Sequence, residues 1–286
     1  MGSNSSSSSI PRKDEPVPDC SPAFGTLAEE ALVPFSTEQY PFLQPVQSIL
    51  QCGGVPVNEL HRSASCSEDH LVDGGATSST IGPRDSAFMK RWQTSKHDPE
   101  ASGYVDFAAV YHAFLRDVVR GDLGEDMILY QRIPTLRVHL AGAPAIGRPH
   151  RDADYHHSAY ELNYWLPLGD VAGTNSLWAE SVRDRGDFHP FVASYGEAVR
   201  FYGNQAWHFT LRNTSERTRV SFDFRVMRFS DLRRAGVPVD YSRAPLSREE
   251  HRTRGRGGQF CLGGFYGLMG AAGEVPREQA EALCAG

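Results

Sequence analysis

The chain has 286 residues, of which 40% are apolar and 22% are charged, proportions that are ordinary for a soluble globular protein. Its net charge of −6 gives no reason to expect nucleic acid or an anionic membrane as a partner, and no apolar run is long enough to span a bilayer. The five cysteines are widely spread and contain no C-x-x-C pair, and no apolar segment follows the N-terminus. We therefore expect a cytoplasmic location; the oligomeric state stays open.

Residues 1–20 are rich in Ser and then in Pro and charged residues, a composition that predicts a disordered tail. Gly2 and Ser6 stand where an N-myristoylation signal needs them, but a polyserine tail without lipid is the favoured interpretation.

Residues 21–125 are predicted to form an irregular and helical segment packed on the outside of a core domain. Up to residue 85, short apolar pieces are broken by Gly and Pro. Within residues 85–120 the apolar residues recur at steps of three and four, which predicts an amphipathic helix ending near Gly121. These apolar residues are Phe107, Val110, Tyr111, Phe114 and Val118.

From residue 126 to the end, the sequence predicts a β-rich core with a C-terminal extension. Apolar and polar residues alternate in the segments 135–140, 161–166 and 219–226, and clusters of Gly, Pro, Asn and Asp separate them. Short alternating strands indicate a sandwich or barrel and not βαβ units. The polar faces would meet water in a one-sided sheet, or line a ligand cavity in a closed jelly roll.

The extension, residues 243–286, is rich in Arg and Gly and ends in a predicted helix over Pro276–Cys284. The arginines at 248–256 are interpreted as a solvated loop, since their charge is local and no aromatic residues lie among them.

His150 and Asp152 stand two residues apart in a segment that follows a Gly- and Pro-rich turn, so both side chains can point to one side. His208 comes after a gap of 55 residues, on a later predicted strand. Two imidazoles and one carboxylate on one face of a metal leave open positions, an arrangement that suits non-haem Fe(II). His156 and His157 are close enough to compete as ligands.

After ten more residues comes Arg219, and Ser221 follows on the same strand face. A guanidinium fork with a hydroxyl is a natural receptor for a carboxylate. Arg217 and Arg225 are rivals for this role, but Arg217 lies nearer the turn, and Arg225 lies six residues further, roughly 20 Å along a strand. His150-Arg151-Asp152 also spells the kinase catalytic-loop triplet, an interpretation that fails because the other kinase motifs are missing.

Four segments together resemble a known family: HRDADYHHS (150–158), ELNYWLPL (161–168), TNSLWAES (174–181) and RTRVSFDFRV (217–226). They are similar to the StrG-like, phytanoyl-CoA hydroxylase-related proteins of streptomycin-type biosynthesis, within the Fe(II)/2-oxoglutarate-dependent oxygenases. The match runs over about residues 125–230. It implies a double-stranded β-helix (jelly roll, cupin-like) with flanking N-terminal helices.

The resemblance also implies site residues and a reaction. His150, Asp152 and His208 match the iron ligands, and Arg219 with Ser221 matches the 2-oxoglutarate clamp, to which Asn163 adds a further contact. The implied cosubstrates are 2-oxoglutarate and dioxygen, and the implied reaction is hydroxylation of a small polar metabolite with release of succinate and CO2. Candidate substrate residues are Tyr155, His157, Glu161, Trp165 and Arg137.

Several alternatives stay open. Glu161, Asp154 and Tyr155 could contact substrate or hold the metal ligands, and Arg137 and His139 could belong to a buried hydrogen-bond network. The function could also be that of a cupin-like metal enzyme without 2-oxoglutarate, or of a non-catalytic metal- and metabolite-binding protein.

Overall fold

The computed structural model describes residues 24–63, 87–98, 102–155, 157–241 and 260–285. The expected tail over residues 1–20, the arginine-rich segment 248–256 and His156 lie outside these ranges. Among the described residues, none of the helices combines the length and the apolar character needed to cross a membrane.

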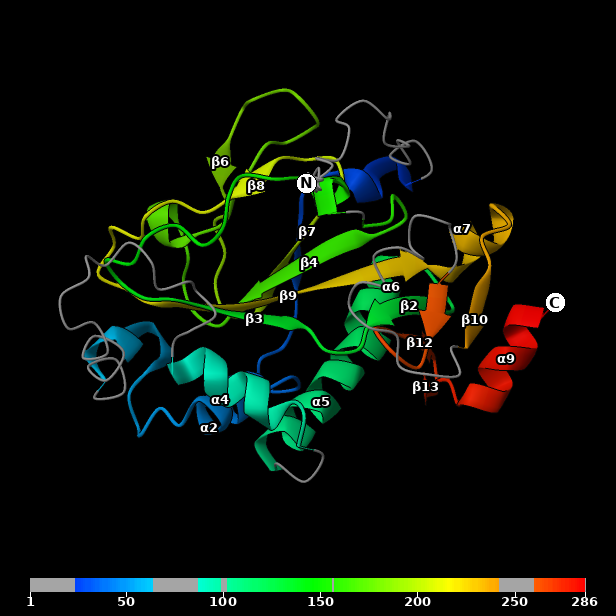
Figure 1. The fold of residues 1–286 in the computed structure, drawn as a ribbon, viewed down its shortest axis with the longest axis horizontal. Coiled ribbons are helices and arrows are strands. Elements are labelled where there is room, and N and C mark those ends of the chain that lie inside the picture. Colours follow the sequence, from blue (N-terminus) through cyan, green and yellow to red (C-terminus); the bar gives the residue numbers. More distant parts are fainter. Residues whose placement is uncertain (1–23, 64–86, 99–101, 156, 242–259, 286) are drawn as a thin grey trace, which may run out of the picture.

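Two sheets carry the fold, which is the predicted jelly roll with helices on one side (Figure 1). The smaller sheet has the order β6 (His189–Pro190), β5 (Trp178–Ala179) and β8 (His208–Phe209). The larger sheet has the order β1 (Ala31–Pro34), β7 (Glu197–Phe201), β4 (Leu162–Pro167), β9 (Arg219–Arg228), β2 (Ile128–Gln131), β12 (Tyr266–Gly270), β11 (Phe260–Leu262) and β10 (Val239–Tyr241). In addition, β3 (Thr135–His139) pairs with β9, and β13 (Gly273–Glu274) pairs with β12. The pairs are antiparallel except for β10–β11 and β11–β12.

The three predicted strands are present as β3, β4 and β9, and their alternation separates two environments. On β9, Phe222, Phe224 and Val226 belong to the largest apolar core, whereas Arg219 and Arg225 line a cavity on the opposite face. Strand β4 repeats this division. A strand with one apolar and one polar face is stable here because the polar face lines an enclosed site.

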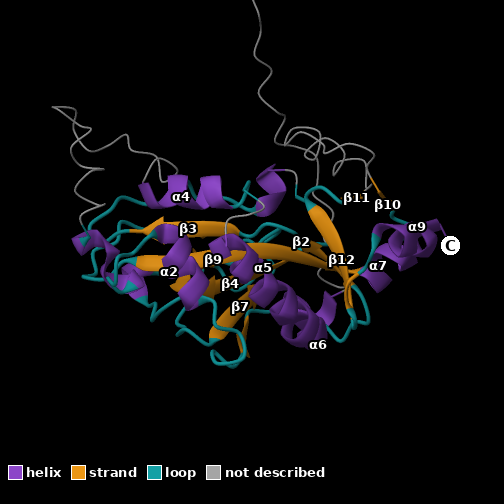
Figure 2. Ribbon diagram, turned by 90° about the horizontal axis from the view of Figure 1, so that it is seen from below, coloured by secondary structure: helices purple, strands orange, loops and turns teal. Residues whose placement is uncertain are grey.

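The N-terminal helices cover the apolar face of the larger sheet, opposite to the smaller sheet (Figures 1 and 2). They are α2 (Leu43–Leu50), α4 (Ala87–Ser95) and α5 (Ser102–Phe114), and α5 continues through the π-helical turn η3 (Leu115–Val119) into α6 (Arg120–Asp122). Two 3₁₀ turns, η1 (Gly25–Ala28) and η2 (Val57–Arg62), accompany them. The ring of Phe222 lies 5.0 Å from that of Phe42 and 5.4 Å from that of Phe107. The helical segment and the sheet therefore share one core.

The predicted helix near residues 85–120 differs from the structure in one respect. The apolar steps from Phe107 to Val118 fall in α5 and η3, and the helical run ends at Asp122, close to the predicted Gly121. Residues 87–95 form a separate helix, α4.

The C-terminal extension builds a second apolar core around β2 and β12. Helices α7 (Phe229–Arg234) and α9 (Arg277–Ala285) contribute to it, and α9 agrees with the predicted Pro276–Cys284 helix. Strand β12 thereby joins the main sheet next to β2, which brings its first residue, Tyr266, close to the site described below.

Candidate metal and cosubstrate site

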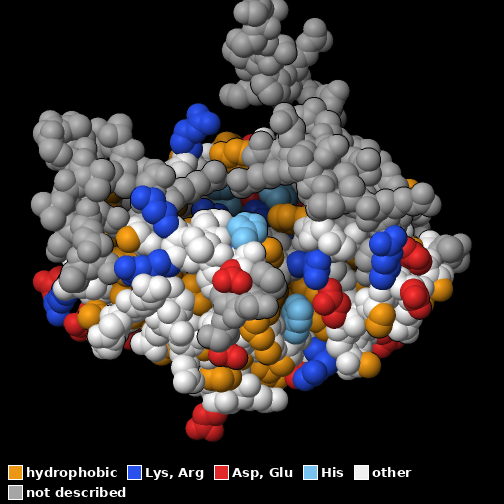
Figure 3. Space-filling model, turned by 60° about the horizontal axis from the view of Figure 1, so that its bottom comes forward, with side chains coloured by type: hydrophobic (Ala, Val, Ile, Leu, Met, Phe, Trp, Pro, Cys, Tyr) orange, Lys and Arg blue, Asp and Glu red, His pale blue; other side chains and the backbone are white. Residues whose placement is uncertain are grey.

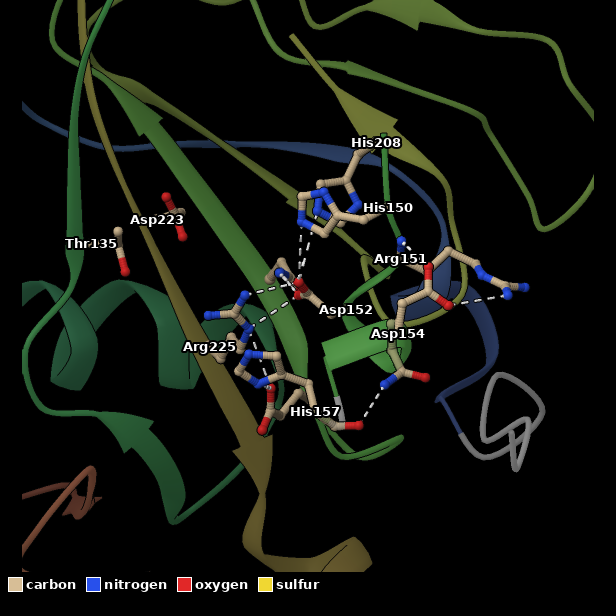
Figure 4. Close-up of polar contacts among 12 residues, drawn as sticks. Thr135, His150, Arg151, Asp152, Asp154, His157, His208, Asp223 and Arg225 are labelled. Atoms are coloured by element: carbon tan, nitrogen blue, oxygen red, sulfur yellow. Dashed lines mark hydrogen bonds and ion pairs between the residues drawn. The ribbon is translucent and has the colours of Figure 1, made fainter. Parts of the chain in front are cut away.

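The three predicted metal ligands meet at one point (Figure 4). His150 and His208 are held side by side by paired backbone hydrogen bonds of 3.2 and 2.9 Å. Asp152 begins the 3₁₀ turn η4 (Asp152–Tyr155). The Nε2 atoms of His150 and His208 lie 4.0 and 3.8 Å from Asp152 Oδ1. The three ligand atoms lie within 4.8 Å of one another, so one ion could contact all of them.

Backbone carbonyls set the orientation of both imidazoles. Nδ1 of His150 is 2.8 Å from the carbonyl oxygen of Arg148, and Nδ1 of His208 is 3.0 Å from that of Ala206. A carbonyl only accepts, so each Nδ1 carries the proton and each Nε2 keeps a lone pair toward Asp152. Burial lowers the pKa of His208, which favours this neutral, metal-binding form.

The Asp152 carboxylate is almost fully buried, with 1% of its surface exposed. Arg225 donates to Oδ2 from Nε at 3.0 Å and to Oδ1 from Nη2 at 2.9 Å, and Asn163 Nδ2 donates to Oδ2 at 2.7 Å. Burial alone would raise the pKa of Asp152, but chiefly the charge of Arg225 and its hydrogen bonds hold it well below its usual range. Asp152 is therefore a carboxylate near neutral pH.

Gly203 provides the space for Asn163. A Cβ atom at position 203 would lie only 2.9 Å from the Asn163 side chain. The backbone carbonyl of Gly203 also accepts a 2.8 Å hydrogen bond from the Asp152 N–H. A side chain at position 203 would therefore displace a group that holds the carboxylate.

Arg219 and Ser221 each carry a buried polar atom that has no hydrogen-bond partner among the described residues. Arg219 is 3% exposed, and its Nη1 donates to the Asn175 carbonyl at 3.1 Å. Among the described residues, Arg219 has no carboxylate within ion-pair distance, and neither its Nε nor Ser221 Oγ has a hydrogen-bond partner. Burial, reinforced by the positive charge of Arg137, lowers the pKa of Arg219 to about 9. A buried guanidinium without a counter-ion is the receptor that an anionic ligand needs.

Arg219 lines an open pocket between the two sheets, and Ser221 follows two residues later on the same face of β9. Figure 3 shows a hollow in which His and basic side chains are visible. The described residues around the pocket are Arg137, Ile146, His150, Asn163, Trp165, Leu177, Phe201, His208, Phe209, Thr210, Arg219, Asp223 and Arg225. The pocket thus brings together the two histidines of the triad and the Arg219 guanidinium.

No protein-family model matches the chain. Among curated proteins, the streptomycin biosynthesis protein StrG of Streptomyces griseus is 36% identical over 175 residues, which are 60% of this chain and 79% of StrG. The chain belongs to the StrG family. The resemblance predicted from the four sequence segments is confirmed.

Solved structures that resemble this StrG-family protein are more distant. The carbocyclase SnoK of nogalamycin biosynthesis, described as non-heme and α-ketoglutarate-dependent, is 16% identical with a TM-score of 0.44, over 86% of this chain and 94% of SnoK. EctD of S. alaskensis with bound Fe is 14% identical with a TM-score of 0.44, over 78% of this chain and 81% of EctD. Likenesses at this level are too distant to assign an activity.

The residues of the StrG-family protein fit the two groups that the sequence implies. Two imidazole nitrogens and one carboxylate oxygen form the donor set of a non-haem Fe(II) site, so the triad fits iron binding. The unpaired Arg219 and the unpartnered Ser221 hydroxyl fit the distal carboxylate of 2-oxoglutarate.

Arg217 and Arg225, the rivals of Arg219, have other partners. Arg217 is exposed and lies 3.2 Å from Asp170 Oδ2. Arg225 is buried and bonded to Asp152, as described above. Arg219 is therefore the one of these three arginines without a carboxylate, which supports its predicted role.

The predicted substrate residues lie in three different places. Arg137 and Trp165 line the pocket, and Arg137 also pairs with Asp223 at 3.0 Å. Glu161 and His157 instead pair with each other at 2.9 Å behind the metal ligands. Tyr155 is 39% exposed and its ring lies edge-on, 5.0 Å from that of His150.

Asn163 and Asp154 each bond a neighbour within this region. The Asn163 amide N–H points to Asp152, so the predicted contact with 2-oxoglutarate would fall to another atom of this side chain. Asp154 accepts from the Arg151 backbone N–H at 3.0 Å, which stabilises the turn that carries Asp152.

Three residues of the site were missed by the sequence interpretation. Asp223 could have been found, because it stands on the same face of the 219–226 alternation as Arg219. Arg225 was considered only as a rival clamp and not as the partner of Asp152. Tyr266, whose hydroxyl donates to Glu161, had no local signal, because its position depends on the pairing of β12 with β2.

His139 provides a pH prediction for this region. Its Nε2–H donates to the Pro144 carbonyl at 2.9 Å, and its buried Nδ1 has no partner among the described residues. Burial and the nearby Arg219 charge lower the pKa of His139 to about 4. An unfolded histidine takes up its proton near pH 6.5, so this residue lowers the free energy of unfolding as the pH falls from about 6.5 to about 4.

We expect His139→Gln, which keeps an N–H for Pro144 but cannot be protonated, to lose less stability over this range. The measurement is Tm at several pH values between 7 and 4.5 for wild type and variant. A difference in Tm that stays constant with pH would contradict the prediction.

Proposed function

We propose that this StrG-family protein is an Fe(II)/2-oxoglutarate-dependent dioxygenase that hydroxylates a small polar metabolite. In the balanced reaction, substrate C–H, 2-oxoglutarate and dioxygen give substrate C–OH, succinate and CO2. The observation that carries the proposal is that the buried Arg219, which has no carboxylate within ion-pair distance among the described residues, lines one pocket with His150 and His208, the two histidines that cluster with Asp152. A cytoplasmic location belongs to the same proposal.

Each part of the pocket has a role in this proposal. His150, Asp152 and His208 would hold the iron, which supplies the oxidation chemistry when it is bound with its cosubstrates. Arg219 and Ser221 would bind the distal carboxylate of 2-oxoglutarate, and the Trp165 ring, 5.8 Å from the Arg219 guanidinium carbon, would exclude water from this pair.

The mouth of the pocket would bind the substrate. Arg137 and Asp223 supply charged groups there, and Phe209 and Ile146 supply apolar surface. A mixed lining of this kind suits a polar molecule with an apolar edge. The Arg219 guanidinium counts against a metal enzyme that does not use 2-oxoglutarate, because such an enzyme would leave this charge without a partner.

Succinate formation tests the proposal directly. We expect the anaerobically purified chain, loaded with Fe(II), to produce succinate from 2-oxoglutarate and dioxygen, and faster when the correct metabolite from a panel is present. Loading with Zn(II), which has no redox chemistry, is the matched control and should give none. Absence of succinate with Fe(II), alone and with every metabolite, would contradict catalysis and favour a non-catalytic binding protein.

A further inference from the structure

The Asp152 carboxylate is held from behind by groups that are not metal ligands, as Figure 4 shows. We propose that Arg225 is a positioning residue which, together with Asn163, leaves a single acceptor position of Asp152 available to the metal. This inference rests on the proposed metal site, and it concerns how the chain presents its one anionic ligand.

The Asp152 carboxylate can accept only a limited number of hydrogen bonds and metal contacts. A carboxylate has about four lone-pair positions, two on each oxygen. Oδ2 accepts from Arg225 Nε at 3.0 Å and from Asn163 Nδ2 at 2.7 Å, which occupies both of its positions. Oδ1 accepts from Arg225 Nη2 at 2.9 Å. One position on Oδ1 remains.

That remaining position faces the histidines. Oδ1 is the oxygen that lies 4.0 and 3.8 Å from the two Nε2 atoms. The carboxylate would therefore bind a metal through one oxygen only, because rotation to a two-oxygen mode would break the Arg225 fork and the Asn163 bond. Monodentate binding keeps a further coordination position open for a chelating cosubstrate.

Arg225 is itself held by a second carboxylate. Its Nε lies 3.3 Å from Glu161 Oε2, and this oxygen is 2.9 Å from His157 Nδ1. The Tyr266 hydroxyl donates to Glu161 Oε1. All four side chains are largely buried, so the guanidinium is fixed between two carboxylates by close packing.

This chain of contacts gives the C-terminal extension a role at the site. Tyr266 is the first residue of β12, which pairs with β2 and not with the strands that carry the metal ligands. The extension would thus support the metal site through a series of contacts. Tyr266 contacts Glu161, Glu161 contacts Arg225, and Arg225 holds the Asp152 carboxylate.

Arg225→Lys is the test variant, because it keeps the positive charge and removes the two-pronged fork. Arg200→Lys is the matched control: the Arg200 side chain is 8% exposed against 11% for Arg225, its Nη1 donates to both Asp122 oxygens at 2.8 Å, and it does not line the pocket. Each protein is titrated with Co(II), whose visible spectrum reports both affinity and coordination, and Tm of the metal-free form is measured in parallel.

We expect Arg225→Lys to weaken Co(II) binding by about 10- to 100-fold and to alter the cobalt spectrum. Arg200→Lys should lower Tm but leave affinity and spectrum at the wild-type values. Tyr266→Phe, which removes only the contact with Glu161, should weaken Co(II) binding in the same direction by a smaller factor.

Two negative results have different meanings. If wild type binds Co(II) and Asp152→Ala does not, but Arg225→Lys keeps the wild-type affinity and spectrum, the positioning role is wrong and the proposed function stands. If wild type itself does not bind Co(II), the proposed metal site fails and the inference fails with it.

Discussion

Replacing Arg219 by Met should greatly weaken the binding of 2-oxoglutarate and, at the same time, make the metal-free protein more stable. Truncating one partner of a buried ion pair costs about 2–5 kcal/mol, so the affinity for 2-oxoglutarate should fall by roughly 30- to 4,000-fold. In the absence of ligand, Arg219 is a buried charge with no counter-ion among the described residues. Met fills a similar volume without that desolvation cost.

The two effects have opposite signs, which makes the prediction specific. The measurements are the Kd for 2-oxoglutarate in the metal-loaded protein and Tm of the metal-free protein. Arg217→Met is the control, because Arg217 stands two residues earlier and forms only an exposed pair with Asp170. If Arg219→Met lowers Tm and leaves the affinity for 2-oxoglutarate unchanged, the clamp is assigned to the wrong residue.

Asp152→Ala should remove metal binding and destabilise the protein. The variant deletes the anionic ligand and leaves the Arg225 fork facing an apolar methyl group. Breaking a buried ion pair on one side costs about 3–5 kcal/mol, so Tm should fall by several degrees. Both results would be read from Co(II) titration and thermal unfolding of the same preparations.

Asp154→Ala is the matched control for this change. Asp154 lies in the same 3₁₀ turn, but it is exposed and pairs with Arg151. It should keep the affinity for Co(II) close to the wild-type value. Equal loss of metal affinity in both variants would show that the turn as a whole, and not the Asp152 carboxylate, supports binding.

Local patterns predicted the parts of the fold that depend on near neighbours. The period of two in residues 219–226 correctly separates Phe222 and Phe224 from Arg219 and Ser221, because a strand points alternate side chains to opposite faces. The His-x-Asp pair and the later His were recognised as one set from chemistry and order along the chain. The structure brings all three together.

The contacts that the sequence could not indicate depend on pairing between strands that are far apart in the chain. Glu161 was considered either as a substrate contact or as a group that holds the metal ligands. It is buried between Arg225 and Tyr266, and Tyr266 comes from a strand more than 100 residues further along the chain. The alternation of polar and apolar residues along a strand does not indicate which other strand lies next to it. Local patterns therefore predicted neither the contact between Tyr266 and Glu161 nor the role of Arg225. The boundary between the N-terminal segment and the core near residue 125 stays a prediction, since both contribute to one apolar core.

Anaerobic titration of the Fe(II)-loaded protein with 2-oxoglutarate tests the central claim most directly, because the chelate has a visible charge-transfer band. We predict a saturable band in the wild-type protein that is absent from Asp152→Ala and that needs a much higher 2-oxoglutarate concentration in Arg219→Met. A wild-type protein that binds Fe(II) but develops no band at any 2-oxoglutarate concentration would contradict the claim that His150, Asp152, His208 and Arg219 form one iron and 2-oxoglutarate site.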